Sequence, residues 1–398
     1  MGFSEYSGIV FYKCSEVVLM IGMVVPVKHL TDLKKLKKKF KDSKSLKKFK
    51  RQIKDSKSLK KLKSEIKDNE NIKKIENKLL SSEDPFPKTN HPCVDVILAY
   101  VQLMRPLEWS KTLMNMVFGL LIAFYVYSAV VSLPVFILGF ISVAILWAGL
   151  YALNDFTDFK ADILHPNKKF RPIPSGKIKP NNALFFSIDL IIASFLIGLA
   201  IGNAVFIGVL FVMLVNQLLY TTKPFKFKSR RVLDIISGSV VNPICRYFAG
   251  LFLFISAFEI ISVGVAILPI ILVVGVQTGS YIWYRFSSKA HETKLAIKGS
   301  VAVVSVKSVK RVSRYVILVA ILAYFGLFTN FLFFKNAELG FLPPQYLLAM
   351  GVIIFGAPLG WFIRRNPGAA TNKYFGVAFH LAAIIFSIIH LVIFVFLP

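Results

Sequence analysis

The densest group of side chains that could carry out chemistry lies between Tyr151 and Gly176. An amide and three carboxylates follow one another closely there: Asn154, Asp155, Asp158 and Asp162. If the apolar run before them continues as a helix, spacings of three, four and seven residues bring them to one side of it. Such crowded carboxylates repel one another unless a cation joins them, and hard oxygen ligands suit Mg²⁺, which water and substrate phosphates commonly complete. We therefore predict that these four residues are metal ligands within a catalytic site.

Basic side chains follow at a distance that suits the same ligand. Lys168, Lys169 and Arg171 come shortly after the acids, and such cations bind phosphate oxygens through charge-assisted hydrogen bonds. The plain alternative is a solvated acidic helix end followed by ordinary loop cations. The spacing N-D-x-x-D-x-x-x-D together with R-P-I-P-S-G favours a diphosphate site over that alternative.

The composition indicates that a membrane-embedded helical body must position these residues. Of the 398 residues, 55% are hydrophobic and 18% are charged, and the mean hydropathy is +0.62, whereas a soluble protein carries about 25% charged residues. Nine apolar runs are each long enough to cross ~30 Å of hydrocarbon: residues 112–131, 134–153, 183–202, 204–221, 234–255, 258–284, 315–334, 345–362 and 374–397. We predict an all-α polytopic membrane protein, with a nine-helix transmembrane bundle over residues 94–398.

The N-terminal part of the chain differs from this body in charge and in pattern. Residues 28–79 contain 21 Lys and Arg against 7 Asp and Glu, and they align as four units with a period of 13. The apolar residues of a unit fall on one face of a helix. We predict an N-terminal segment over 1–27, a Lys-rich helical-repeat extension over 28–80 and a linker over 81–93. The repeats could bind an anionic membrane surface or form a solvated extension, and we expect no specific nucleic-acid partner.

Charge also predicts the orientation of the body. The connections 154–182, 222–231, 285–314 and 363–373 are rich in Lys and Arg, whereas the alternate connections are almost free of cations. The positive-inside rule then places the basic connections, the N-terminus and the active site in the cytoplasm, and the C-terminus outside. We expect a multi-pass integral protein of the cell membrane.

Three elements resemble the signatures of a known family. They are N-D-x-x-D-x-x-x-D followed by R-P-I-P-S-G, the start R-P-x-x-x-x-K from Arg105 to Lys111, and YTTKPFKFKSRRVLD from Tyr220 to Asp234. Together they resemble the UbiA superfamily of intramembrane prenyltransferases over roughly residues 100–398. The resemblance implies a nine-helix membrane fold that uses Mg²⁺ to hold the diphosphate of a prenyl donor.

The resemblance also implies roles for single residues. Tyr151 and Tyr220 would line the site or flank the cation that develops on the donor. The implied metal ligands are Asn154, Asp158, Asp162 and, as a ligand or beside the ligands, Asp155. The substrate-binding candidates, from the residues and the resemblance together, are Lys111, Lys169, Arg171, Lys226, Lys228, Arg246 and Glu292.

One departure from the family bears on the donor. Prenyl-transferring members carry a second D-x-x-x-D motif near the sixth span, but residues 275–314 contain no aspartate and a single acid, Glu292. Lys226, Lys228, Lys289 and Lys294 could supply the missing charge, and Glu292 could hold a metal alone. In addition, H-P-N-K-K-F-R-P-I-P-S-G, and Asp234 followed by Arg246, are similar to the decaprenyl-phosphate phosphoribosyltransferase branch.

Arg246 stands out for a second reason, because it lies inside an apolar span. A charge there costs ~2.5–3.5 kcal/mol on insertion scales. We therefore expect Arg246 to have a functional or paired role, with Asp234 as a candidate partner.

The function predicted first is Mg²⁺-dependent transfer of a polyprenyl group from its diphosphate to a hydrophobic acceptor, either a lipid or an aromatic compound. The alternative is phosphoribosyl transfer from phosphoribosyl diphosphate to a polyprenyl phosphate. A second alternative, a non-enzymatic transporter or scaffold, would not need carboxylates clustered at one helix end and would place polar residues near mid-membrane on several helices.

Overall fold

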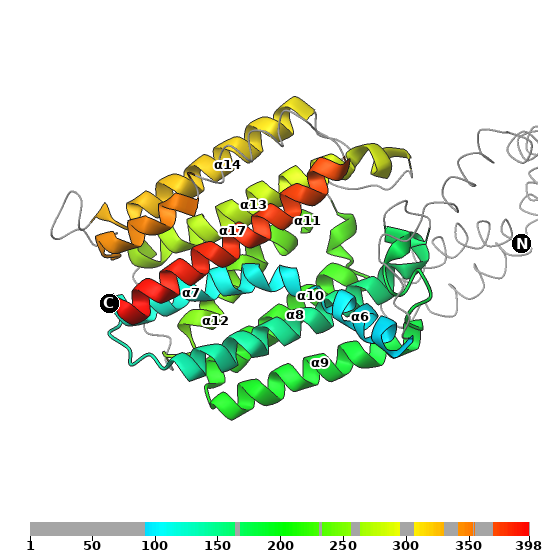
Figure 1. The fold of residues 1–398 in the computed structure, drawn as a ribbon, viewed down its shortest axis with the longest axis horizontal. Helices are drawn as coiled ribbons and strands as arrows, with labels where there is room; N and C mark the ends of the chain where they lie inside the picture. The colour runs from blue at the N-terminus through cyan, green and yellow to red at the C-terminus, as the bar shows by residue number, and fades with distance from the viewer. Residues whose placement is uncertain are drawn as a thin grey trace, which may run out of the picture. The chain divides into compact units, whose positions relative to one another are not determined.

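The described part of the chain is helical, with no strand among its residues. The computed structural model describes residues 92–163, 168–230, 233–255, 263–294, 306–329, 341–352, 354 and 369–397, all within the second of two units, Pro85–Pro398. The longer helices of this unit (Figure 1) are α6 (Pro92–Met104), α7 (Trp109–Tyr125), α8 (Leu133–Asp162), α9 (Pro180–Ile201), α10 (Ala204–Thr221), α12 (Asn242–Leu251), α13 (Val263–Lys294), α14 (Val306–Gly326) and α17 (Ala369–Phe396). Short 3₁₀ helices lie at Pro106–Glu108, Lys168–Phe170, Phe227–Ser229 and Pro344–Ala349.

The predicted all-helical membrane fold is confirmed. Each predicted span overlaps a described helix, although for residues 345–362 the overlap begins in the 3₁₀ helix Pro344–Ala349 and the rest is mostly undescribed. Within the described residues, four helices are both long and apolar enough to cross a membrane, namely α8, α9, α10 and the Gly376–Phe396 part of α17.

Several predictions fall outside the described residues. The segment 1–27, the repeats 28–80 with their proposed lipid binding, and most of the linker 81–93 belong to this group. Glu292 lies in α13, but its side chain is outside the described part. These stay predictions.

The hairpin between α9 and α10 shows how the sequence sets element boundaries. Pro180 starts α9, where a missing N–H costs nothing, and Gly202 ends it with a left-handed φ of 79°. Asn203 then caps α10, because its side-chain oxygen accepts hydrogen bonds from the backbone N–H of Val205 at 3.0 Å and of Phe206 at 3.2 Å. Two residues therefore reverse the chain between two apolar helices.

The fifth predicted span is built from three consecutive pieces. A short helix, α11 (Leu233–Ile235), leads into a π-helix over Ile236–Val241, and α12 continues from Asn242. π-helical turns often occur at functional sites. Here the π-helix contributes Gly238 and Ser239 to the wall of a large cavity.

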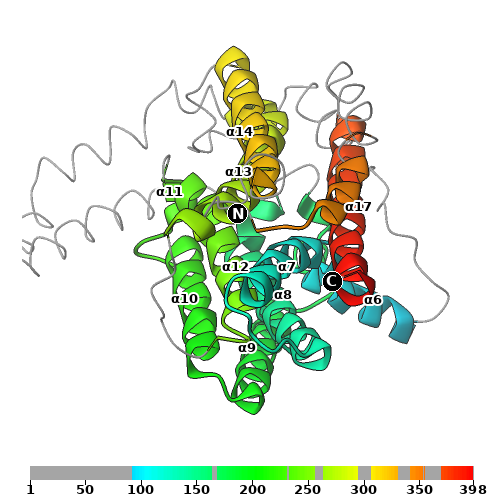
Figure 2. The same cartoon turned by 90° about the vertical axis from the view of Figure 1, so that its left-hand side faces the viewer.

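Helix α7 occupies the middle of the bundle and packs on both α12 and α17, while α8 packs on α9 and α13 on α14 (Figures 1 and 2). Gly119 and Gly250 bring α7 and α12 together. A Cβ at Gly250 would lie 2.6 Å from the Cα of Met116, and one at Gly119 would collide with the backbone at Tyr247. The backbones of these helices therefore meet without intervening side chains.

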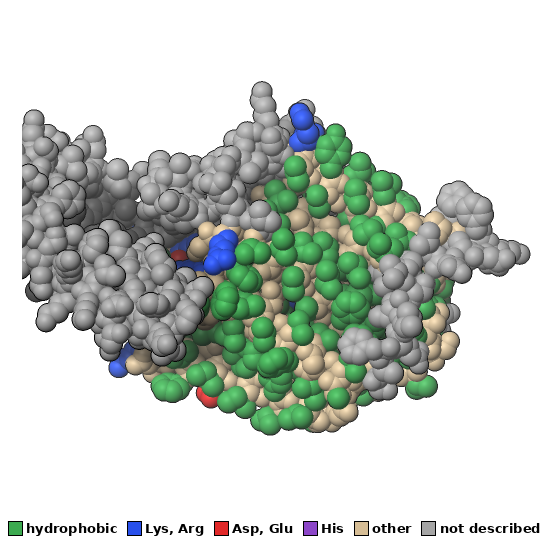
Figure 3. All heavy atoms as spheres, turned by 180° about the vertical axis from the view of Figure 1, so that it is seen from behind, with side chains coloured by type: hydrophobic (Ala, Val, Ile, Leu, Met, Phe, Trp, Pro, Cys, Tyr) green, Lys and Arg blue, Asp and Glu red, His purple; other side chains and the backbone are tan. Residues whose placement is uncertain are grey.

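The outer surface is strongly apolar. Hydrophobic side chains cover much of the described part of the face shown in Figure 3. On α9, Phe185 is 64% exposed and Leu196 is 60% exposed, and on α10 Phe211 is 58% exposed. Helices that point such side chains outward are typical of contact with lipid rather than water.

Candidate active site

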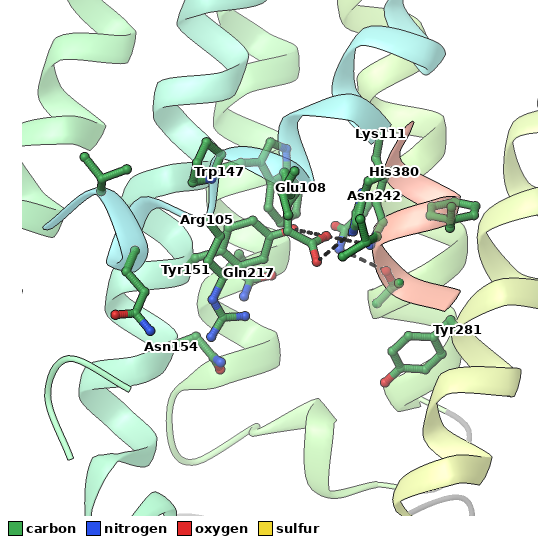
Figure 4. Close-up of a pocket in the computed structure, with 18 of the residues that line it drawn as sticks. Arg105, Glu108, Lys111, Trp147, Tyr151, Asn154, Gln217, Asn242, Tyr281 and His380 are labelled. Carbon is green, nitrogen blue, oxygen red and sulfur yellow. Dashed lines mark hydrogen bonds and ion pairs between the residues drawn. The ribbon is translucent and has the colours of Figure 1, made fainter. Parts of the chain in front are cut away.

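A cavity of about 1020 Å³ lies among helices α6, α7, α8, α10, α12, α13 and α17. One part of its wall is apolar and comes from α6 and α17, with Leu98, Val101 and Phe379 among the residues. Another part is polar and aromatic (Figure 4): Arg105, Glu108, Lys111, Trp147, Tyr151, Asn154, Gln217, Asn242, Tyr281 and His380. The cavity is therefore amphipathic and joins the end of α8 to the interior of the bundle.

The four predicted ligands at the end of α8 form two pairs, which differ in the cations that they contact. At 100° per residue, the four side chains fall within about 100° of one another around the helix, and the cations that they contact distinguish the pairs. The oxygens of Asn154 and Asp158 meet at one cation, because Nζ of Lys228 lies 2.8 Å from Oδ1 of Asn154 and 2.8 Å from Oδ2 of Asp158. This pair therefore has the arrangement of a cation site.

Arginines hold the second pair. Nη1 of Arg171 donates to Oδ1 of Asp155 at 3.0 Å and to Oδ2 of Asp162 at 2.7 Å. Arg105 also pairs with Asp155, and Nζ of Lys168 lies 3.7 Å from Asp162. Both aspartates are buried, with 2% and 4% of their surface exposed, so breaking these pairs would leave buried charges uncompensated.

Lys228 lies in a largely dry position. Its side chain is 10% exposed, and burial lowers the pKa of its ammonium group, while the carboxylate of Asp158 acts in the opposite direction. The connection after α10 brings Lys228 to α8, since Phe227–Ser229 forms a 3₁₀ helix beside the end of α10. A residue that follows α10 in the chain thus meets the end of α8 at Asn154, which lines the cavity.

The donor set fits Mg²⁺ in chemistry and only partly in geometry. No group of three His, Cys, Asp or Glu side chains within the described residues is arranged to hold a metal ion. Asn154 and Asp158 nevertheless present two oxygens to one cation, and Mg²⁺ usually takes one or two protein carboxylates and completes its shell with water and phosphates. The ion would have to take the place of the Lys228 ammonium group.

The other aromatic and basic candidates, Tyr151, Tyr220, Lys169 and Lys226, each lie in a different local environment. Tyr151 lies under Arg105, whose Cζ is 5.1 Å from the ring centroid. Tyr220 donates a hydrogen bond to Asp234 at 2.9 Å. Lys169 lies with Nζ 4.8 Å from the ring centroid of its neighbour Phe170. Lys226 has a left-handed backbone, with φ of 40°, where the 3₁₀ helix Phe227–Ser229 begins.

Lys111 belongs to a compact polar cluster with Glu108. Nζ of Lys111 lies 2.5 Å from Oε2 of Glu108, and Nε2 of His380 lies 3.6 Å from Oε1. His380 in turn contacts Oγ of Ser110 through Nδ1 at 2.7 Å. Burial opposes the charged form of Glu108, but Lys111 and His380 outweigh it and hold the pKa of that carboxyl well below its ordinary value. Glu108 is therefore ionised at neutral pH and is a weak proton acceptor.

A family model named UbiA prenyltransferase family matches residues 113–387. The chain belongs to the UbiA prenyltransferase family. The digeranylgeranylglyceryl phosphate synthase of Methanobrevibacter smithii is 29% identical over 153 residues, 38% of this chain and 51% of that protein. The decaprenyl-phosphate phosphoribosyltransferase of Mycolicibacterium smegmatis is 30% identical over 176 residues, 41% of this chain and 51% of that protein. The chain thus spans about half the length of these curated relatives.

The fold of the UbiA family is also found among solved structures. The apo structure of a UbiA homolog from Aeropyrum pernix K1 superposes with a TM-score of 0.57 at 17% identity, covering 73% of this chain and 99% of that chain. At this identity the likeness establishes the fold.

Sequence reasoning left several residues of this UbiA site without a role. Glu108, Gln277 and Tyr281 were missed, since each is a single polar residue without a recognisable spacing. His380 was missed for the same reason; it is 8% exposed and lines the cavity. Arg105 entered only as part of the R-P-x-x-x-x-K start, and that motif was the available signal for its contact with Asp155.

Proposed function

We propose that the chain transfers an isoprenoid group from its diphosphate to a hydrophobic acceptor, in a Mg²⁺-dependent reaction within the membrane. The observation that carries the proposal is the meeting of Asn154 and Asp158 at one cation, beside a cavity that Asn154 itself lines. The apolar wall from α6 and α17 suits an isoprenoid chain, and the polar end suits its diphosphate. Membership of the prenyltransferase family supports the same choice.

The chemistry needs one bond to break and one to form. The bond between C1 of the isoprenoid and its diphosphate oxygen breaks, and the diphosphate leaves with the electron pair. The nucleophilic atom of the acceptor forms the new bond to C1, and its proton passes to the released diphosphate. Mg²⁺ bound to Asn154 and Asp158 would neutralise charge on the departing group.

The residues of the chain supply positioning and charge. Lys228 would turn from the carboxylate of Asp158 to the phosphate oxygens, where it stabilises the developing charge. Arg171 keeps Asp155 and Asp162 fixed behind the site. Tyr151 presents an aromatic face, which suits a developing allylic cation, and the apolar wall of the cavity would limit the water near that cation.

Phosphoribosyl transfer is the second candidate, and one observation favours it. A decaprenyl-phosphate phosphoribosyltransferase is among the relatives, at 30% identity. A ribosyl diphosphate would use the same two oxygen ligands and the same lysine. The apolar wall would then hold the polyprenyl chain of the acceptor.

The donor decides between the two candidates. Purified full-length protein is offered labelled geranylgeranyl diphosphate or labelled phosphoribosyl diphosphate, with extracted membrane lipids and Mg²⁺. We expect label from the isoprenoid donor to enter lipid. Label entering only from the ribosyl donor would establish the second candidate, and label from neither, without Mg²⁺-dependent binding of either donor, would favour a non-enzymatic protein.

A further inference from the structure

Arg246 lies on the wall of the cavity, away from the end of α8, and the proposed transfer step leaves it unused. It is 3% exposed, and its guanidinium stacks on Trp147, with Cζ 4.0 Å from the ring centroid. Nη1 donates to Oε1 of Gln277 at 3.4 Å. Among the described residues no carboxylate forms an ion pair with it, so its charge is held by a neutral amide and an aromatic face.

Around Arg246, several buried hydrogen-bond donors have no acceptor. Nε of Arg246, Nε1 of Trp147 and Nδ2 of Asn115 are buried and have no hydrogen-bond partner in the described structure. The side-chain N–H of Gln277 donates to Oδ1 of Asn115 at 2.7 Å, and the side-chain oxygen of Gln277 faces Arg246. Buried donors normally have partners, and a buried charge without a counter-charge is costly. A ligand that supplies acceptor oxygens would satisfy both requirements.

The site is built from four helices. Asn115 comes from α7, Trp147 from α8, Arg246 from α12 and Gln277 from α13. Arg246, Trp147 and Gln277 all line the cavity, so a molecule in the cavity can reach them. Stacking on Trp147 and the hydrogen bond to Gln277 fix the guanidinium of Arg246. Its N–H groups can then donate to two oxygens of a planar carboxylate or of a tetrahedral phosphate.

This group lies apart from the diphosphate end. Trp147, Tyr151 and Asn154 lie on successive turns of α8 (Figure 4), and the seven residues from Trp147 to Asn154 correspond to about 10 Å along the helix. Arg246, stacked on Trp147, is therefore about two turns away from the oxygens that would hold the metal. One diphosphate held by Asn154 and Asp158 would leave this second position free.

We propose that Arg246, positioned by Trp147 and Gln277, binds an oxyanion of the acceptor. The acceptor is then an amphipathic anion, a lipid monophosphate or a carboxylate, and its anionic group is an anchor separate from the atom that attacks the donor. The proposal rests on the transfer function proposed above, because it assigns the second substrate of the same cavity.

The test compares head groups on one short isoprenoid chain. Geranyl monophosphate, geranic acid and geraniol are titrated by calorimetry into the detergent-solubilised full-length protein in EDTA, which keeps metal-dependent binding out of the measurement. We expect the wild-type protein to bind the monophosphate or the acid about tenfold or more tightly than the alcohol, as charge-assisted hydrogen bonds require. The preferred anion distinguishes phosphate from carboxylate. In Arg246→Gln this preference should disappear, and in Arg246→Lys part of it should remain.

A second arm separates this site from the donor site. Mg²⁺-dependent binding of geranyl diphosphate should change less than about twofold in Arg246→Gln, whereas Asp158→Asn should lose it and keep the monophosphate or acid preference. Equal binding of all three head groups by the wild-type protein would overturn the proposal even if Arg246→Gln fails to fold. A preference that survives in Arg246→Gln, or that disappears in Asp158→Asn together with donor binding, would equally overturn it. Loss of donor binding alone would instead count against the proposed transfer function.

Discussion

Without a ligand, Lys228 neutralises the carboxylate of Asp158 at the end of α8. Its ammonium group occupies the point at which Asn154 and Asp158 converge. A metal ion and Lys228 therefore compete for the same oxygens, although both are needed once a diphosphate is bound. Removing Lys228 should therefore raise the affinity for Mg²⁺ and lower the affinity for the diphosphate donor.

Replacing Lys228 with Met should strengthen Mg²⁺ binding in the absence of donor, because the competing cation is gone. The same change should weaken donor binding at saturating Mg²⁺ by roughly tenfold, because a charge-assisted hydrogen bond to phosphate is lost. Calorimetric titrations of Mg²⁺ and of geranylgeranyl diphosphate measure the two effects. Lys223→Met, an exposed lysine of the same connection, is the matched control and should leave both unchanged. Unaltered affinities in Lys228→Met would show that the lysine does not share the metal position.

At the scale of elements, the contact between α7 and α12 depends on two glycines. Gly250→Ala should lower stability by about 1–3 kcal/mol, the usual cost of an overpacked contact, because its Cβ would meet the backbone of Met116. Gly208→Ala in α10 is the control, since a Cβ there meets nothing within 4 Å and alanine favours a helix over glycine. Thermal unfolding in detergent should give a lower Tm only for Gly250→Ala. Equal Tm values for the two variants would mean that the helices are not packed this closely.

The sequence predicted the long elements well, because their signals are local. The runs 183–202 and 204–221 nearly coincide with α9 and α10, since Pro180, Gly202 and Asn203 mark their ends. Helix α6 was not predicted as an element, because Pro92–Met104 is too short to span the membrane and is partly polar. The break of the fifth span into a π-helix and α12 has no periodic signal either.

The site was predictable only where its residues share a motif. Asn154, Asp155, Asp158 and Asp162 are adjacent in sequence, and their place at one helix end follows from the helix period. Their division into two pairs does not follow from that period, because it depends on which cations tertiary packing brings to them. The contact of Lys228 with Asp158 joins residues 70 positions apart, and no local pattern specifies it.

The whole molecule has a predicted orientation that is open to direct measurement. Val130 is 94% exposed in the connection between α7 and α8, and Ser175 is exposed in the basic connection after α8. In a cysteine-free background, Val130→Cys should react with a membrane-impermeant maleimide in intact cells, and Ser175→Cys should react only after the cells are opened. The reverse pattern would place the carboxylate end of α8 outside the cell.

The central claim is that one end of this bundle holds a diphosphate through a metal bound to Asn154 and Asp158. The most direct measurement is equilibrium binding of labelled geranylgeranyl diphosphate to the purified full-length protein, with Mg²⁺ or with EDTA, for the wild-type protein and Asp158→Asn. We expect saturable binding by the wild-type protein in Mg²⁺, loss of that binding in EDTA, and at least about tenfold weaker binding by Asp158→Asn protein that is folded and monodisperse in detergent. Binding that is equally tight in EDTA and in Asp158→Asn would contradict the account.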